Sequence, residues 1–298
     1  MAQLMEASVP TGTFEITPRG PYSLAAAASF AFGPERGQDE GAMRLAFAVD
    51  GGKETAAVVV HQDPSGAVHG EVWGPGDVRT VRAQVARILS LDRDGSGWAQ
   101  VAQRDPVLSE LQARHPGFRQ VLFSSPYEAA AWSVLYGRKT LRQVRALRDR
   151  VATRYGDTYQ VQGVPLAAFP APARLLPARP EPGIAEVIVQ RLHAVARFAS
   201  EGRLEVERLR AMDEAVAIAE LRRLPGVGEF FSELILLRAA GPMDAWRRSD
   251  RLDACIRHYY GVDPTEDGRF QEIGDRLRPY RSWAMVLLRR CGDEDGVA

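Results

Sequence analysis

Two glycines in one short turn constrain the fold of this chain more than any other feature. Residues 221–238 read Leu-Arg-Arg-Leu-Pro-Gly-Val-Gly-Glu-Phe-Phe-Ser-Glu-Leu-Ile-Leu-Leu-Arg. Pro225 ends the incoming helix, because proline disfavours helical geometry in the residue before it. Gly226 and Gly228 permit a positive φ and let the backbone of another molecule come close. A second helix is expected near Glu229, where the first N–H groups lack partners and can bind an anion. The stretch predicts two helices joined by a tight hairpin that binds a phosphate.

The bulk composition indicates a globular chain. Its 298 residues are 45% hydrophobic and 26% charged, which is ordinary for a globular protein with a sizeable core. No apolar run reaches the length of a membrane span, and the short run at 24–32 lacks the basic flank of a secretory signal. Cys255 and Cys291 cannot build a disulfide framework and lack the spacing of a zinc or iron–sulfur site. We expect no metal, no membrane association and a reducing, cytoplasmic setting.

Charge is unevenly spread, although the net charge is zero. Residues 1–76 hold four basic and nine acidic residues, a net charge of −5, whereas residues 77–298 hold 34 and 29, a net charge of +5. The basic excess therefore lies in the part of the chain that contains the hairpin. Of the 38 basic residues only Lys53 and Lys139 are lysines, and a GC-rich genome explains that bias more readily than nucleic-acid binding does.

The predicted elements divide the chain into a small N-terminal α/β unit and a larger helical region. In the first unit, strands are expected at 13–16, 43–49, 55–61 and 68–73 and a helix at 24–32, in the order β-α-β-β-β with antiparallel pairing. Helices are then expected at 78–91, 106–113, 128–136, 139–155, 184–200, 215–223, 229–240, 251–260, 272–278 and 281–290. Residues 156–183 contain six prolines from Pro165 to Pro182 and are expected to be irregular apart from a helix at 172–176. The pattern predicts a mostly helical α+β fold with domains at 1–76 and 77–298.

Three glycine-loop types compete for Gly226-Val227-Gly228. A dinucleotide-binding loop needs a preceding strand and a small residue three positions after the second glycine, but a helix is expected before this loop and Phe231 occupies that position. A nucleotide P-loop needs Gly-Lys-Ser/Thr, which is missing. A helix-hairpin-helix needs helix, Leu-Pro-Gly-Xaa-Gly, helix, and binds the phosphates of one DNA strand through backbone N–H groups without reading its sequence. The sequence fits this third type, and an ordinary helical turn is the alternative.

The segment beyond the hairpin resembles the helix-hairpin-helix/Gly-Pro-Asp superfamily of DNA glycosylases. Residues 244–252 read Asp-Ala-Trp-Arg-Arg-Ser-Asp-Arg-Leu, and within the superfamily the chain is most similar to 3-methyladenine DNA glycosylase II, the AlkA-like type. Other similar segments are Ala-Arg-His-Pro-Gly-Phe-Arg at 113–119, Phe-Pro-Ala-Pro at 169–172 and Arg-Pro-Tyr-Arg-Ser at 278–282. The N-terminal unit matches an additional α/β domain of the family, so the resemblance covers most of the chain. It implies two helical subdomains with a cleft between them.

The resemblance implies that Asp250, 22 residues beyond Gly228, is the catalytic carboxylate. In glycoside hydrolysis such a group stabilises an oxocarbenium-like sugar, positions water, or both. Considered alone, Asp250 is more simply the N-cap of the helix at 251–260, because aspartate favours that position. Three nearby arginines would favour the ionised carboxylate or hold it in a salt bridge, namely Arg247, Arg248 and Arg251.

The resemblance also implies a base pocket and a DNA-binding surface. By position, the pocket residues are Phe30, Trp132, Phe230, Leu234 and Arg289, of which the last two replace family aromatics. The DNA-binding residues are Leu224, Gly226, Val227, Gly228 and Glu229 in the hairpin and Tyr136, Arg138 and Lys139 in a wedge turn that fills the gap left by a flipped base. The alternative for each pocket aromatic is an ordinary core position. No cofactor is expected beyond a monovalent cation that hairpin carbonyls could bind.

Phe230 carries a further implication about the reaction. Bifunctional relatives have a lysine in the first turn of the second hairpin helix and form a Schiff base with the sugar, whereas this chain has no lysine from 140 to 298. The prediction is a monofunctional, monomeric DNA N-glycosylase of the cytoplasm and nucleoid. It would flip and excise alkylated bases, such as 3-methyladenine and 7-methylguanine, from double-stranded DNA in base excision repair. Two hypotheses compete with it: a non-catalytic binder of damaged or bent DNA on the same fold, and a nucleotide-binding enzyme.

Overall fold

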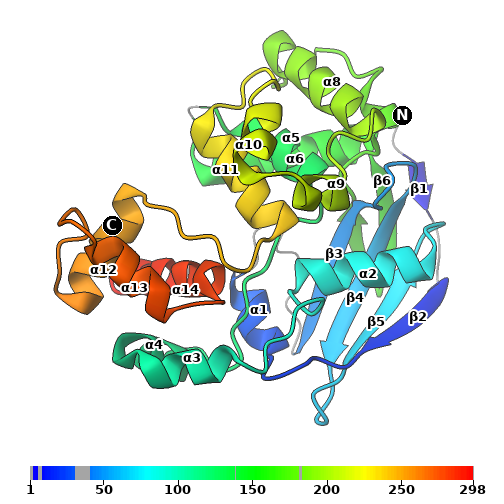
Figure 1. Ribbon diagram of the computed structural model, residues 1–298. Coiled ribbons are helices and arrows are strands. Elements are labelled where there is room, and N and C mark those ends of the chain that lie inside the picture. Colours follow the sequence, from blue (N-terminus) through cyan, green and yellow to red (C-terminus); the bar gives the residue numbers. More distant parts are fainter. Residues whose placement is uncertain (1–2, 6–8, 31–40, 138, 181–182, 298) are drawn as a thin grey trace.

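The computed structural model describes residues 3–5, 9–30, 41–137, 139–180 and 183–297 (Figure 1). The strands are β1 (Gln3–Met5), β2 (Gly12–Ile16), β3 (Ala42–Ala48), β4 (Thr55–Gln62), β5 (Val68–Trp73), β6 (Asp157–Val161) and β7 (Val164–Ala167). The helices are α1 (Leu24–Phe30), α2 (Val78–Ile88), α3 (Trp98–Arg104), α4 (Pro106–Arg114), α5 (Pro126–Tyr136), α6 (Leu141–Tyr155), α7 (Pro172–Leu175), α8 (Glu186–Ser200), α9 (Val206–Ala211), α10 (Glu214–Leu221), α11 (Glu229–Ile235), the π-helix η1 (Leu236–Ala240), α12 (Asp250–Tyr260), α13 (Arg269–Arg276) and α14 (Arg281–Glu294).

The N-terminal unit is a four-stranded antiparallel sheet in the order β2-β5-β4-β3. The central strand β4 is buried from Thr55 to Val60, because both faces of the sheet are covered. Val58 and Val60 pack with α1 and α2 on one face, while Ala57 and Val59 pack against β6 and β7 on the other. The predicted strands of this unit are therefore confirmed, and α2 adds to its core.

Residues 157–167 differ from the prediction. The stretch expected to be irregular forms the hairpin β6–β7, and β6 also pairs in parallel with β1. Gln162 and Gly163 both have positive φ, 50° and 79°, as a tight two-residue hairpin turn requires. Pro165 lies in β7, the edge strand of this small sheet, where its missing N–H costs no ladder hydrogen bond.

One helical subdomain is built around α5. Its residues Ala129, Ala131, Trp132 and Leu135 are buried on several sides of the helix, because α6, α8, α11 and η1 surround it. Ser125 caps α5 and Pro126 occupies the first turn, as the sequence indicates. In Figure 1 this subdomain, which includes the hairpin helices α10 and α11, lies above the sheet.

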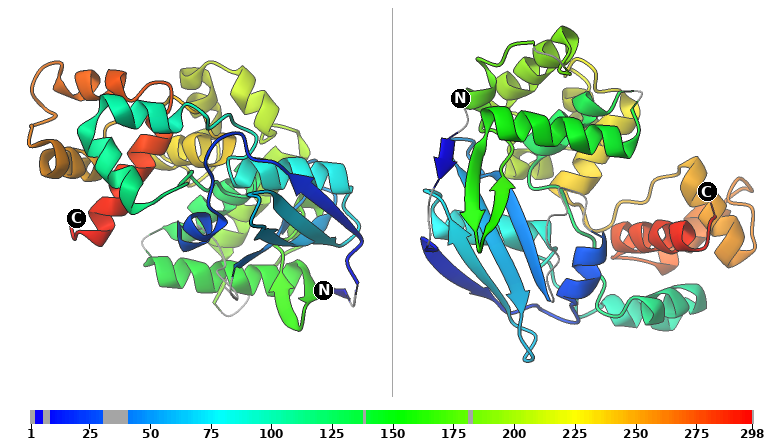
Figure 2. Two further views of the ribbon diagram at one scale, coloured as in Figure 1. Left: turned by 90° about the horizontal axis from the view of Figure 1, so that it is seen from below. Right: turned by 180° about the vertical axis from the view of Figure 1, so that it is seen from behind.

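The second helical subdomain joins two distant parts of the chain. The helices α3 and α4 share one core with α12, α13 and α14, centred on the buried Trp283. Figure 2 shows α3 and α4 beside the C-terminal helices in both views. Helix α3 and helix α9 were not predicted. The fold class, mostly helical with a small antiparallel sheet, is confirmed. The domain division at residue 76 stays a prediction, and the packing of α2 and β6–β7 on the sheet crosses it.

Candidate active site and DNA-binding surface

The hairpin between α10 and α11 is a tight turn with two buried anchors. The N–H of Val227 donates to the carbonyl of Leu224 over 3.0 Å, and Gly226 between them has a φ of 90°. Both anchors are buried, whereas Gly226, Gly228 and Glu229 are exposed. The predicted DNA-binding residues of the hairpin therefore divide into two groups: Leu224 and Val227 hold the turn from inside, and Gly226, Gly228 and Glu229 lie at the surface.

The two glycines serve different purposes. A Cβ on Gly226 would lie 3.0 Å from the Arg191 side chain and would also be strained by the positive φ. A Cβ on Gly228 would meet no atom within 4 Å among the described residues. Gly228 caps α11 in an extended conformation without a side-chain hydrogen bond. Gly226 is thus needed for the conformation of the turn, whereas Gly228 leaves the backbone at the start of α11 uncovered by a side chain.

A row of three aromatic rings connects the hairpin helix to the wedge turn. Phe230, in the first turn of α11, is 62% exposed and contacts Phe231 edge to face, with ring centroids 5.2 Å apart. Phe231 contacts Tyr136 in the same way at 5.6 Å. The structure therefore brings two predicted site residues, Phe230 and Tyr136, to one row through Phe231, which sequence reasoning missed although it adjoins Phe230. Lys139 is half-buried and donates its N–H to the Tyr136 carbonyl.

The remaining predicted pocket residues lie deeper or outside the described part of the chain. Trp132 is 8% exposed and packs on Phe123, with ring centroids 6.1 Å apart. Leu234 is half-buried against the core around α5. The Phe30 side chain and Arg138 lie outside the described residues.

The segment from η1 to α12 is fixed at several points. The Asp244 carboxylate accepts from Arg278 at 2.7 Å and from Arg281 at 2.8 Å. Trp246 stacks on Phe270 with centroids 4.7 Å apart, and its Nε1–H donates to the Phe270 carbonyl over 2.9 Å. These contacts tie the segment to α13 and α14, so the residues that follow it start α12 from a defined position.

Asp250 is the first residue of α12, and Ser249 is its N-cap. The Ser249 hydroxyl oxygen accepts from the Leu252 N–H at 3.2 Å, with the extended backbone of a capping residue. The interpretation of Asp250 as the N-cap is therefore wrong: serine already holds that position. The Asp250 side chain is exposed, and no hydrogen bond or ion pair joins it to another described residue.

The three arginines near Asp250 bind other carboxylates. Arg247 donates to Glu214, Arg248 binds Asp253 at 2.6 Å, and Arg251 forms an ion pair with Asp293. The hydrogen bond to Asp253 raises the pKa of Arg248, and the Asp250 charge adds a smaller contribution in the same direction. Asp250 therefore has positive charge nearby and is not locked into a salt bridge within the described chain. Such a carboxylate is available to a ligand.

Arg289, on α14, lies in a second basic group. It is half-buried, and burial lowers its pKa, with the Arg251 charge acting in the same direction. Burial likewise lowers the pKa of Arg238 in η1 to about 9, and Arg289 contributes to this shift. Arg238 donates to the Val121 carbonyl at 2.8 Å. That Asp250 faces a cleft beside Phe230 stays a prediction.

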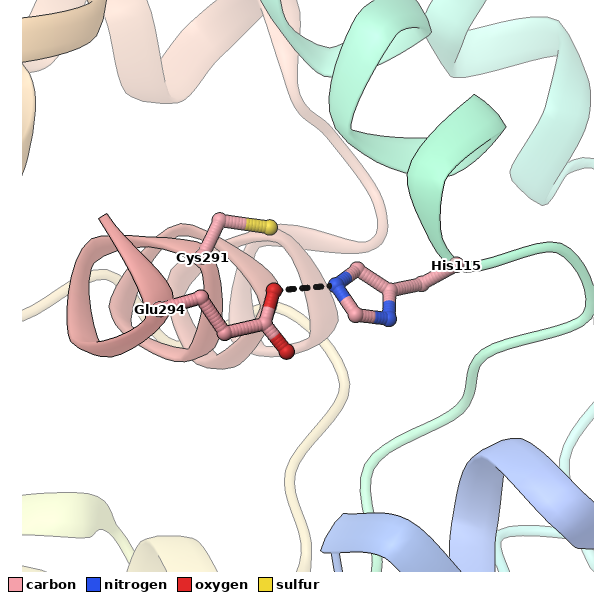
Figure 3. A group of neighbouring side chains, drawn as sticks. All are labelled: His115, Cys291 and Glu294. Atoms are coloured by element: carbon pink, nitrogen blue, oxygen red, sulfur yellow. Dashed lines mark hydrogen bonds and ion pairs between the residues drawn. The ribbon is translucent and has the colours of Figure 1, made fainter.

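One group of side chains in the described chain has donor atoms close enough for a metal ion: His115, Cys291 and Glu294, within 4.8 Å of one another (Figure 3). The imidazole of His115 lies 2.9 Å from the Glu294 carboxylate. Two guanidinium groups also bind that carboxylate, Arg114 at 3.3 Å and Arg290 at 2.8 Å. Burial raises the pKa of the Cys291 thiol to about 11, which opposes the thiolate that a metal needs. This cluster has the features of an ion-pair network that fastens α4 to α14.

The hairpin, the helical subdomains and the sheet define the class: the chain has the helix-hairpin-helix DNA glycosylase fold. The structure of the 3-methyladenine DNA-glycosylase from Archaeoglobus fulgidus matches with a TM-score of 0.76 over 94% of this chain and 98% of that chain, at 20% identity. The 8-oxoguanine glycosylase/lyase from Clostridium acetobutylicum, in complex with double-stranded DNA, matches with a TM-score of 0.66 over 92% and 93%, at 15% identity.

In sequence, the chain is similar to two curated proteins. It is 27% identical over 214 residues to the probable bifunctional transcriptional activator/DNA repair enzyme AlkA of Mycobacterium tuberculosis, covering 71% of this chain and 42% of that protein. It is 24% identical over 210 residues to the DNA-3-methyladenine glycosylase of Bacillus subtilis, covering 68% and 69%. No protein-family model matches. The similarity confirms the resemblance to AlkA-like glycosylases. Among the described residues, each helix is too short or too polar to cross a bilayer.

Proposed function

We propose that this protein is a DNA N-glycosylase that removes damaged bases from double-stranded DNA, with Asp250 as its catalytic carboxylate. The observation that carries the proposal is the state of Asp250: exposed, without a partner in the described chain, and placed at a helix start that Ser249 caps and Trp246 helps to fix. The 3-methyladenine glycosylase activity named for relatives at low identity supports it.

The chemistry follows from these positions. The glycosidic bond is buried in the base stack, so the nucleotide must be flipped out before it can react. The hairpin N–H groups would hold one strand by its phosphates, while Tyr136 or the neighbouring turn fills the gap. As the base departs, the sugar gains positive charge, and the Asp250 carboxylate would stabilise that charge and orient a water molecule.

The finer proposal is a monomeric, monofunctional enzyme for alkylated bases. Phe230 stands in the first turn of α11, where a lysine would be needed for Schiff-base chemistry, and its ring is exposed enough to stack on a base. A glycosylase/lyase is among the proteins with this fold, so fold likeness alone does not favour a monofunctional enzyme. The presence of phenylalanine instead of lysine at position 230 favours a monofunctional enzyme.

The test is base release from methylated duplex DNA by wild type and by Asp250→Asn. We expect the substitution to lower the single-turnover rate on the order of a hundredfold or more. Asp267→Asn, which removes an exposed carboxylate from the loop before α13, is the matched control and should keep full activity. Strand breaks should appear only after alkali treatment, because the enzyme leaves an abasic site intact.

The second candidate function is a non-catalytic binder of damaged DNA. It is favoured by Arg289 and Leu234, which stand where the family has pocket aromatics. It predicts lesion-dependent binding that survives Asp250→Asn without base loss in either protein. If neither wild type nor Asp250→Asn releases a base from alkylated DNA, the catalytic proposal is therefore contradicted.

A further inference from the structure

The side chain of Arg191, on α8, lies against the hairpin turn. A Cβ on Gly226 would lie 3.0 Å from the Cδ of Arg191 and 3.1 Å from its Nε and Nη1. Both the stem and the charged end of the arginine therefore rest on the glycine. Gly226 is exposed and Arg191 is half-buried, so the guanidinium is at the surface of the turn, beside backbone that a ligand can reach.

The charge of Arg191 is not neutralised within the described part of the chain. No hydrogen bond or ion pair joins this side chain to another described residue. Glu220, near the end of α10, is already bound by Arg203 at 2.6 Å and by Arg223 at 2.9 Å. Residues three and four positions away on a helix are the neighbours that could pair with Arg191. All four are apolar: Val187, Ile188, Ala194 and Val195.

An unpaired guanidinium at this place suits an anionic ligand. Its planar fork of N–H donors matches the oxygens of a phosphate group, and such charge-assisted hydrogen bonds are among the strong ones. Resting on the proposed function, which brings a DNA strand to the hairpin, we propose that Arg191 binds a phosphodiester group of that strand. The strand is then held by a side chain from α8 in addition to the backbone N–H groups of the turn.

A purely structural role for Arg191 is the alternative, because its stem packs on the turn. The two roles depend on different parts of the side chain. Support of the turn needs the apolar stem, including the Cδ beside Gly226, whereas a phosphate contact needs the positive charge. Arg191→Met keeps an unbranched stem and removes the charge, so this variant distinguishes the two roles.

The experiment measures DNA binding as a function of salt concentration. The duplex carries a tetrahydrofuran abasic-site analogue, which has no base to release, so that binding is measured without catalysis. Each arginine–phosphate contact releases counterions, and Arg191→Met should therefore reduce the slope of log affinity against log salt by about 0.9. The affinity at low salt should fall by about tenfold, as for the loss of a charge-assisted hydrogen bond. Urea unfolding should show a stability close to wild type.

Two further variants complete this measurement. Arg191→Lys keeps the charge and should keep a slope close to that of wild type. Arg197→Met is the matched control, because it removes an exposed arginine from the same helix. Six residues separate the two positions, which places them roughly 120° apart around the axis of α8. Arg197→Met should therefore keep the wild-type slope.

Neutral methylphosphonates, placed one at a time in the same duplex, locate the phosphate that Arg191 binds. At that phosphate the substitution should weaken binding by wild type but add little to the loss in Arg191→Met, because the two changes remove the same contact. At other contacted phosphates both proteins should lose affinity equally.

Three results would overturn the inference. The first is an unchanged slope in Arg191→Met, and the second is an equal reduction in Arg197→Met, which would indicate a long-range effect of net charge. The third is an equal reduction in Arg191→Lys, which would indicate a structural role. A wild type that binds this duplex with the expected slopes but releases no base from methylated DNA keeps the inference and removes only the proposed catalysis.

Discussion

Ser249 controls the position of Asp250. Its hydroxyl oxygen caps α12 through the Leu252 N–H, which leaves the aspartate one position into the helix and exposed. We expect Ser249→Ala to lower the free energy of unfolding by about 1 kcal/mol, the usual cost of losing an N-cap. The substitution should also slow base release, because Asp250 is then the nearest side chain that can cap the helix.

The control for this prediction is Ser249→Asp, which restores a capping acceptor. Urea unfolding should show stability close to wild type. A change in base release by this stable protein would then come from the added charge beside Asp250 and not from loss of the cap. If Ser249→Ala leaves both stability and base release unchanged, the cap does not position Asp250.

At this scale, the resemblance singled out Asp250 as the candidate carboxylate, but the sequence did not reveal its place in the helix. Serine and aspartate are both favoured caps, so the pair Ser249-Asp250 fits a helix that starts at either residue. The sequence likewise did not indicate which carboxylates bind Arg247, Arg248 and Arg251. Two of them, Glu214 and Asp293, are brought close only by the fold.

At the scale of the element, we expect the two hairpin glycines to affect different properties: Gly226 the stability of the fold, and Gly228 the binding of DNA. Gly226→Ala places a side chain at a φ of 90° against Arg191, so it should lower the free energy of unfolding by roughly 1 kcal/mol or more. Gly228→Ala has an ordinary negative φ and open space, so stability should change little. Its methyl group would nonetheless stand at the helix start where we propose that the DNA backbone approaches.

We therefore expect Gly228→Ala to weaken binding to duplex DNA without destabilising the protein. Denaturant unfolding together with DNA titration at fixed salt distinguishes the two effects. A Gly228→Ala protein with undiminished DNA affinity would show that the hairpin start is not the contact surface.

Elements with strong local signals were predicted and those that depend on tertiary pairing were not. The strand around Val58 is a continuous apolar run between turn residues, and the helix after Ser125 carries capping signals. The hairpin β6–β7 was missed because Pro165 argues against a strand, and only the edge position of β7 permits it. Helix 229–240 was predicted as one unit, while the structure divides it into α11 and the π-helix η1.

At the scale of the whole molecule, one buried arginine holds three parts of the chain together. Arg119 is fully buried and donates to five carbonyl oxygens: those of Arg19, Gly20, Pro21, Ser90 and Arg93. Its guanidinium also lies 5.4 Å from the Trp283 ring in α14. The N-terminal unit, the segment after α2 and the C-terminal helix therefore meet at one side chain.

Replacing this side chain tests whether the parts of the molecule depend on it for stability. Arg119→Leu leaves buried carbonyls without a donor, so we expect the free energy of unfolding to fall by at least about 3 kcal/mol. Arg119→Lys keeps the charge but cannot reproduce the planar fork, so it should lie between wild type and Arg119→Leu. Arg114→Leu, which removes a more exposed arginine bound to Asp295, should cost about 1 kcal/mol or less. Urea unfolding of the four proteins gives this order directly, and equal losses in Arg119→Leu and Arg114→Leu would mean that the five carbonyls find other donors.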